Sequence, residues 1–91
     1  MKWVEIIKLQ VAEIDRESVK HQLPELMSKV DHNGGLYDVK VYHNALVSSD
    51  LSINLYWKSG KVESQGSATG LCLIHVLKTF GLISHSVWIE Q

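Results

Sequence analysis

Apolar and polar side chains alternate in one stretch of the chain, Leu51-Ser52-Ile53-Asn54-Leu55-Tyr56-Trp57-Lys58. Successive side chains of a strand point to opposite faces of a sheet, so this pattern predicts a strand with one buried and one exposed face. Residues 36–46 alternate too, and residues 47–50 between the two stretches are short enough for a hairpin turn. The centre of the chain is therefore expected to form an antiparallel β-hairpin.

Two more strands are expected outside this hairpin. Residues 2–12 are rich in Val and Ile, which is typical of a strand that is largely buried on both faces. Residues 83–90 alternate again between apolar and polar side chains.

Helical spacing marks one segment before the hairpin and one after it. Over residues 15–31 apolar side chains recur at the helical period, Asp15 can cap the first turn, and Gly34 is placed to end the helix. A glycine-containing entry leads into the second expected helix, residues 68–80. The apolar residues of this second helix gather on one side, so we expect His75, on the other side, to face solvent.

The resulting order of elements, βαββαβ, predicts an α+β fold of the ferredoxin-like type. Right-handed crossovers place both helices on one face of a four-stranded antiparallel sheet, and the usual order for this pattern puts the first and third strands at its centre. The 91 residues suffice for a single domain, residues 1–91.

The charge balance argues against nucleic acid or a membrane as a partner. Nine Lys and Arg oppose ten Asp and Glu, which leaves a formal net charge of −1. No apolar stretch reaches the length of about 18 residues that a membrane span needs. The single cysteine, Cys72, lies in an apolar segment and is expected in the core, and no C-x-x-C spacing indicates a zinc site. The missing zinc spacing leads us to expect no bound metal. The first residues also lack the cleavage site of a signal peptide, so we expect a cytoplasmic protein.

The sheet face turned away from the helices is expected to mix aromatic and polar side chains: Tyr42, Asn44, Asn54, Tyr56, Ser86 and Trp88. Patches with aromatic anchors are typical of protein–protein interfaces, so we expect a homodimer joined through this face. The expected interface residues are Tyr42, Asn54, Tyr56 and Trp88. The alternative is a monomer whose wetted sheet carries a few scattered aromatic side chains.

The order of elements, the chain length and the segment Leu55-Tyr56-Trp57-Lys58-Ser59 resemble the dimeric α+β barrel superfamily, and within it the antibiotic biosynthesis monooxygenase-type domains. The resemblance implies two ferredoxin-like sheets packed face to face with the helices outside. It also implies a small-molecule cavity between sheet and helices in each subunit, where Trp57 matches the family's pocket tryptophan.

The family's enzymes oxidise quinol-like aromatic substrates without a cofactor, or degrade haem, so the resemblance implies a small aromatic ligand. Some members use an Asn on the first strand to position substrate or oxygen. Residues 4–11 here read Val-Glu-Ile-Ile-Lys-Leu-Gln-Val and offer no match to that Asn.

Glu5 is the most interesting candidate acid–base residue. If Ile7 faces the helices, so does Glu5, at the end of the sheet where antiparallel geometry also puts Trp57 and Tyr37. A carboxylate beside such aromatic walls would resist ionisation and could transfer a proton. In the other register, Glu5 points to the dimer face or to water, because the two faces of this strand are almost equally apolar.

Two histidines, His43 and His85, lie in register with the apolar sides of their strands and are therefore expected to face the helices. Their strands are the two edges of the expected sheet, roughly 14 Å apart, which excludes a shared ligand within one subunit. Each could act alone as a general base near neutral pH, or be a hydrogen-bonded core or rim histidine.

Small residues precede the second helix in the stretch Ser64-Gln65-Gly66-Ser67-Ala68-Thr69-Gly70. Free amide groups at such a helix entry could receive an anion, although no Lys-Ser or Lys-Thr follows as in a P-loop. A helix cap formed by Ser67 explains the pattern without a ligand.

Two functions fit these observations. The first is a small-molecule pocket protein resembling cofactor-independent monooxygenases, with Trp57 lining the pocket and Glu5, His43 or His85 transferring protons. The second is a non-catalytic homodimeric binding or assembly module. Converging polar groups in an open cavity would favour the first function, and a space filled by apolar side chains would favour the second.

Overall fold

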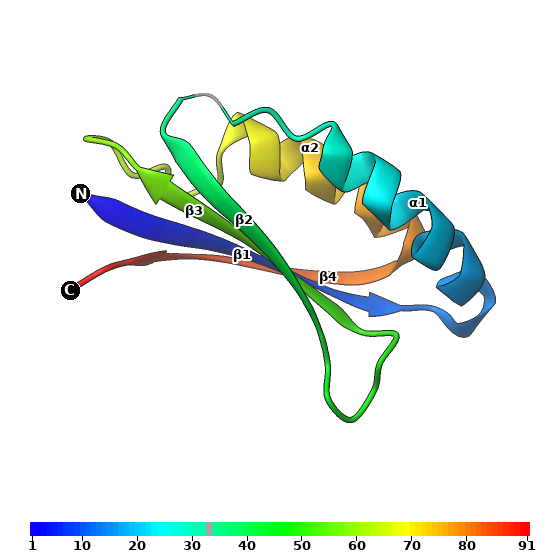
Figure 1. The fold of residues 1–91 in the computed structure, drawn as a ribbon. Coiled ribbons are helices and arrows are strands. Elements are labelled where there is room, and N and C mark those ends of the chain that lie inside the picture. Colours follow the sequence, from blue (N-terminus) through cyan, green and yellow to red (C-terminus); the bar gives the residue numbers. More distant parts are fainter. Residues whose placement is uncertain (33) are drawn as a thin grey trace.

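Four strands form one antiparallel sheet in the order β2-β3-β1-β4 in the computed structural model, which describes residues 1–32 and 34–91. Both helices lie on one face of this sheet (Figure 1), as the βαββαβ order predicts. The first and third strands are central, which confirms the expected ferredoxin-like topology. The elements are β1 (Lys2–Val11), α1 (Arg16–Ser28), β2 (Leu36–His43), β3 (Leu51–Lys58), α2 (Ala68–Leu77) and β4 (Gly81–Ile89).

The register of β1 decides which of its side chains face the helices. Glu5 pairs with Leu55 of β3 and with Val87 of β4, and Ile7 pairs with Ile53 and His85. Odd-numbered residues of β1 are buried on the helix side, whereas the even-numbered residues up to Gln10 are partly or fully exposed. This alternation shows the pattern of a sheet with one covered and one open face.

The core lies between the sheet and the helices and is built on two stacked tryptophans. Trp3 and Trp57 pair across β1 and β3, with ring centroids 5.2 Å apart and ring planes 11° from parallel. Helix α2 contributes Leu73 and Leu77 to this core, and α1 contributes the buried Val19. The other buried apolar residues are Ile7, Leu9, Val11, Leu36, Ile53 and Leu55.

The start and end of α1 differ from the sequence-based expectation. A 3-10 turn, Glu13–Asp15, runs directly into α1, so Asp15 has helical rather than extended torsion angles and its side chain caps no amide. An N-cap needs the extended conformation for its side chain to reach back to the first turn. The helix ends at Ser28, and Gly34, with a φ of +65°, lies in the loop beyond the helix rather than at its end.

Cys72 is exposed, so the expectation of a core cysteine is wrong. Helix α2 turns Gly70, Leu73 and Leu77 toward the sheet, and Cys72 lies about 100° around the helix from Leu73. His75 is exposed on α2, as its helical spacing predicts. Neither helix in the described ranges is long and apolar enough to cross a membrane.

Candidate functional site

Glu5 is fully buried on the helix side of the sheet, with no exposed side-chain surface. Of the two registers that the sequence leaves open, the structure has the one in which Glu5 faces inward. A buried carboxylate is costly unless hydrogen bonds or a cation compensate for the lost water. Its partners therefore define the site.

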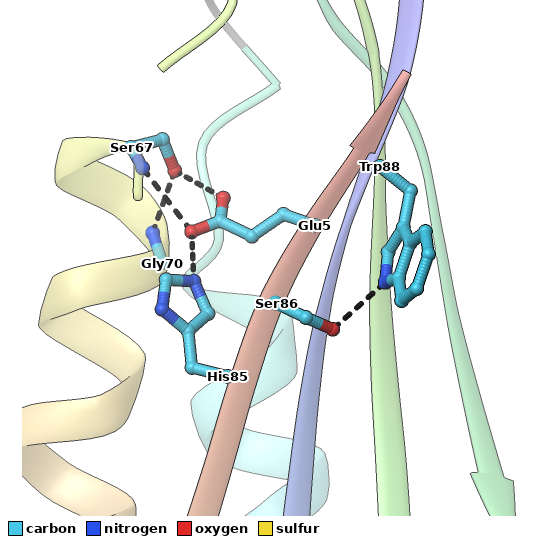
Figure 2. Close-up of polar contacts among 6 residues, drawn as sticks. All are labelled: Glu5, Ser67, Gly70, His85, Ser86 and Trp88. Carbon is cyan, nitrogen blue, oxygen red and sulfur yellow. Dashed lines mark hydrogen bonds and ion pairs between the residues drawn. The ribbon is translucent and has the colours of Figure 1, made fainter. Parts of the chain in front are cut away.

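Three donors surround the Glu5 carboxylate (Figure 2). The Ser67 hydroxyl donates to Oε1 at 2.6 Å, and the Ser67 backbone N–H donates to Oε2 at 3.1 Å. The His85 Nε2 atom lies 2.7 Å from the same Oε2. Because the carboxylate sits at the entry of α2, it also lies at the positive end of the helix dipole, which favours a negative charge.

Ser67 has two functions at once. Its hydroxyl oxygen accepts a hydrogen bond from the Gly70 N–H at 2.9 Å, which is the helix cap expected from the sequence. The same hydroxyl donates its proton to Glu5. The anion that this helix entry could receive is thus supplied by the chain itself, from β1.

Two glycines leave room for this arrangement. A Cβ atom at Gly70 would overlap the Glu5 carboxylate, with Oε1 at 2.7 Å. A Cβ atom at Gly66 would lie 2.6 Å from Cε1 of His85, and Gly66 has a φ of +108°, which favours glycine. The Gly66-Ser67 and Gly70 pattern was visible in the sequence, but nothing in it indicated that Glu5 would fill the space.

His85 reaches Glu5 from the neighbouring strand. It pairs with Ile7, so its side chain is the diagonal neighbour of Glu5 on the same sheet face. Its side chain keeps 19% of its surface exposed, and no described residue forms a hydrogen bond with its Nδ1 atom. A carboxylate that engages one ring nitrogen orients the imidazole and leaves the other nitrogen free to exchange a proton.

Trp57 also lies between the sheet and the helices, and its indole N–H is a hydrogen-bond donor without a partner among the described residues. Only 5% of the residue is exposed, and its Nε1 atom is buried. The stacked Trp3, in contrast, donates from Nε1 to the Ser59 hydroxyl at 3.0 Å. Buried donors without a partner are uncommon in folded proteins, so Trp57 Nε1 is a second polar group of interest.

The structure does not bring Tyr37 to this site. Its ring is half exposed and lies 6.3 Å from that of Tyr56, a residue of the open sheet face. An irregularity between Leu36 and Asp38 shifts the register of β2, which buries Leu36 on the helix side instead. The expectation that Tyr37 lies beside Glu5 is therefore wrong.

His43 is also distant from Glu5. It pairs with Leu51 at the end of edge strand β2 and is exposed, while His85 lies on the opposite edge strand, β4. The separation of the two histidines across the sheet follows the expected strand order. Within residues 1–32 and 34–91, no group of three or more His, Cys, Asp or Glu side chains is arranged to hold a metal ion.

Grooves on the described surface lie elsewhere. One groove of ≈ 460 Å³ runs between α1 and α2 and is lined by residues such as Leu23, Val76 and Phe80. None of the main grooves among the described residues is lined by Glu5, His85 or Trp57. Apolar side chains fill the space beside Trp57 in a single chain, in contrast to the open cavity that the family resemblance implies.

The four expected interface residues share the open sheet face. Tyr42 is 48% exposed and Trp88 is 60% exposed. On the same face, the side-chain amide of Asn54 donates a hydrogen bond to the Tyr56 hydroxyl at 3.3 Å. A hydrogen bond with Tyr56 raises the pKa of the Tyr42 hydroxyl above its ordinary value of 10.0. In Figure 2, Trp88 lies on the other side of the sheet from Glu5. The interface candidates and the acid–base candidates therefore occupy different faces.

The structure is similar along its whole length to several solved structures. A conserved protein from Methanosarcina mazei Go1 has a TM-score of 0.77 at 15% identity, covering 100% of this chain and 94% of that protein. An antibiotic biosynthesis monooxygenase has a TM-score of 0.72 at 9% identity, covering 100% and 99%. A variant of SnoaB, a cofactor-independent oxygenase from Streptomyces nogalater, has a TM-score of 0.63 at 11% identity, covering 99% and 93%.

No model of a known protein family matches the sequence, and no curated protein is similar enough in sequence to count as a match. The similarity thus lies in the fold, which extends over the whole chain at identities of 9–15%. Strand order, helix placement and this similarity agree with one another. The chain has the ferredoxin-like α+β fold found in antibiotic biosynthesis monooxygenase-type proteins.

Proposed function

We propose that this protein is a homodimeric, monooxygenase-like enzyme that acts on a small aromatic or quinol-like molecule without a cofactor. His85 is the acid–base residue, and Glu5 orients it. The observation that carries this proposal is the 2.7 Å contact between His85 Nε2 and the buried Glu5 Oε2. Glu5 is too deeply buried to touch a substrate, so its part is that of a positioning residue.

The chemistry follows from the hydrogen-bond capacities of the two groups. Oε2 of Glu5 already accepts from the Ser67 N–H, and an ionised carboxylate can only accept, so Nε2 of His85 carries the proton of their contact. The lone pair of the neutral imidazole is then on Nδ1, where it can take a proton from a phenol or an acidic methylene group. The developing imidazolium is stabilised by the adjacent carboxylate.

Trp57 provides a hydrogen-bond donor for a ligand between the sheet and the helices. Trp57 pairs with Trp3 on β1, and Trp3 is two positions from Glu5 along the same strand. Trp57 and Glu5 are therefore diagonal neighbours, with their backbones about 8 Å apart. The unpaired Nε1–H of Trp57 can donate to a carbonyl or hydroxyl oxygen of an aromatic molecule. Opening of the apolar packing around Trp57 is required for such a molecule to enter. His43 and Tyr37 have no part in this proposal.

The homodimer rests on the open sheet face. Tyr37, Tyr42 and Trp88 each expose about half of their surface there. Exposed aromatic side chains of this kind, flanked by polar groups such as Lys40, which lies 5.6 Å from the Tyr56 ring centroid, resemble a protein–protein interface. A second copy of the sheet would remove these rings from water.

Oxygen uptake with anthrone tests the enzymatic proposal. In the reaction, the methylene carbon of anthrone loses two hydrogens and gains one atom of O₂ to form anthraquinone, while the other oxygen atom leaves as water. We expect the protein to accelerate both oxygen uptake and anthraquinone formation, and His85→Gln to abolish the acceleration. His75→Gln, which changes an exposed histidine of α2 outside the site, is the matched control and keeps the activity. Equal rates for the wild type and His85→Gln would overturn the assignment.

A non-catalytic homodimeric binding or assembly module is the second candidate. It is favoured by one observation: the space between the sheet and α2 is filled by buried side chains such as Leu55, Leu73 and Leu77. In this case the Glu5–Ser67–His85 cluster only fastens α2 to the sheet. The two candidates differ in the assay above, because this module would dimerise without accelerating anthrone oxidation.

We also propose that the protein acts in the cytoplasm. The lone cysteine, Cys72, is a free and exposed thiol, and such thiols persist in reducing compartments. Fractionation of cells that express the chain with its native ends tests this location.

A further inference from the structure

A groove of ≈ 460 Å³ lies between the beginning of α1 and the β2–β3 hairpin. In Figure 1 these two segments lie at the same end of the sheet, the end farthest from both termini. We propose that this groove binds a small organic anion with a flat apolar body, such as an aromatic carboxylate. This site goes beyond the proposed function, because none of its lining residues belongs to the Glu5–His85 cluster.

The rim of the groove is basic. Arg16 and Lys20 both line it, and they are one helical turn apart on the same side of α1. Neither forms an ion pair with a described residue. Like charges at this spacing destabilise a helix, and a bound anion between them would relieve the repulsion.

One carboxylate also lines the groove, that of Glu17. Its Oε2 atom lies 3.7 Å from Nε2 of His21, the next turn of the helix, and His21 does not line the groove. Across the groove the lining residues of the hairpin include His43 and none that is acidic, because Asp50 lines a different groove. The rim therefore carries two cations, Arg16 and Lys20, and one carboxylate, Glu17, which interacts with His21 outside the groove.

The floor and the far wall complete the chemistry of the site. Val19, Leu23 and Leu51 supply an apolar floor between helix and sheet. The hairpin adds the hydroxyl groups of Ser48 and Ser49, which form no hydrogen bond with other described residues. A volume of this size falls within the usual range for small-molecule sites, about 300–1,000 Å³. An apolar floor below a basic rim with free hydroxyls fits an amphipathic anion better than a bare inorganic ion.

Titration of the ¹⁵N-labelled protein with 2-naphthoate tests this site. We expect amide shifts at Val19, Ser48 and Ser49, and no comparable shifts with the neutral analogue 2-naphthylmethanol. Arg16→Ala combined with Lys20→Ala is expected to weaken 2-naphthoate binding about tenfold or more, since two charged contacts are lost. The matched control, Lys61→Ala combined with Lys78→Ala, removes two exposed lysines elsewhere and leaves the affinity unchanged.

The proposal would be overturned by an absence of shifts at millimolar 2-naphthoate, by equal binding of the neutral alcohol, or by an unchanged affinity in the Arg16 and Lys20 double variant. Shifts that map to the α1–α2 groove or to His85 would equally contradict it, because they would place the ligand elsewhere. The outcome is independent of anthrone oxidation, so failure of one proposal does not imply failure of the other.

Discussion

Nε2 of His85 lies 2.7 Å from Oε2 of Glu5, although the two residues are 80 positions apart in the chain. The contact joins the first strand to the last, and Ser67 extends it to the start of α2. Three elements that are distant in sequence thus depend on one buried carboxylate. This dependence makes the site testable by stability measurements as well as by activity.

Replacing Glu5 by Gln should lower the free energy of unfolding by about 1–3 kcal/mol, because an amide cannot accept all three hydrogen bonds of the carboxylate and leaves a buried group unsatisfied. Urea denaturation measures this change. The matched control is Glu63→Gln, at an exposed position, which should stay within about 0.5 kcal/mol of the wild type. Equal stabilities of the two variants would show that the Glu5 contacts contribute little.

Replacing Gly70 by Ala should destabilise the protein even though alanine favours a helix by about 1 kcal/mol over glycine. The added Cβ would overlap the Glu5 carboxylate and force it out of its place. A double-mutant cycle with Glu5→Ala isolates the cause, since the methyl group has room once the carboxylate is gone. If Gly70→Ala is equally destabilising in both backgrounds, the clash with Glu5 is not the reason.

A proton on His85 Nε2 should be observable by NMR at a pH where imidazoles are neutral. The hydrogen bond to buried Glu5 slows exchange with water, whereas the exposed His75 should show no such signal. In Glu5→Ala the signal should disappear. A proton found on Nδ1 instead would contradict the orientation that the proposed acid–base function needs.

Replacing Trp88 by Lys should convert the proposed dimer into a monomer, because a large aromatic contact would be lost and a charge would be placed in the interface. Sedimentation equilibrium should give twice the chain mass for the wild type and the single chain mass for the variant. Leu71→Lys, at a half-exposed position on α2, is the control and should remain dimeric. A monomeric wild type at micromolar concentration would exclude the interface.

Strand alternation predicted the sheet well because successive side chains point to opposite faces, so a sheet covered on one face has apolar residues at every second position. Residues 51–58 form β3 with the bounds expected from the sequence. The reversed orientation of Tyr37 was not predictable, since the irregularity next to Leu36 breaks the period within β2. That break buries the aliphatic side chain of Leu36 and leaves Tyr37 half exposed.

The site was predicted in parts only. The sequence places His85 on the helix side and its strand beside that of Glu5. It leaves open both whether Glu5 faces the helices and the register that makes the two residues diagonal neighbours. The cap formed by Ser67 is a local signal and was predicted, whereas its bond to Glu5 spans 62 positions and was not. Long-range pairs of this kind depend on register, which turn and helix signals do not fix.

The turnover number for anthrone oxidation in His85→Gln, relative to the wild type, tests the central claim most directly. If His85 is the acid–base residue, the variant should lose about 100-fold or more of its kcat while it stays folded and keeps the oligomeric state of the wild type. Glu5→Gln should lose activity as well, because His85 is then no longer oriented by a carboxylate. A kcat that is unchanged in His85→Gln would contradict the account.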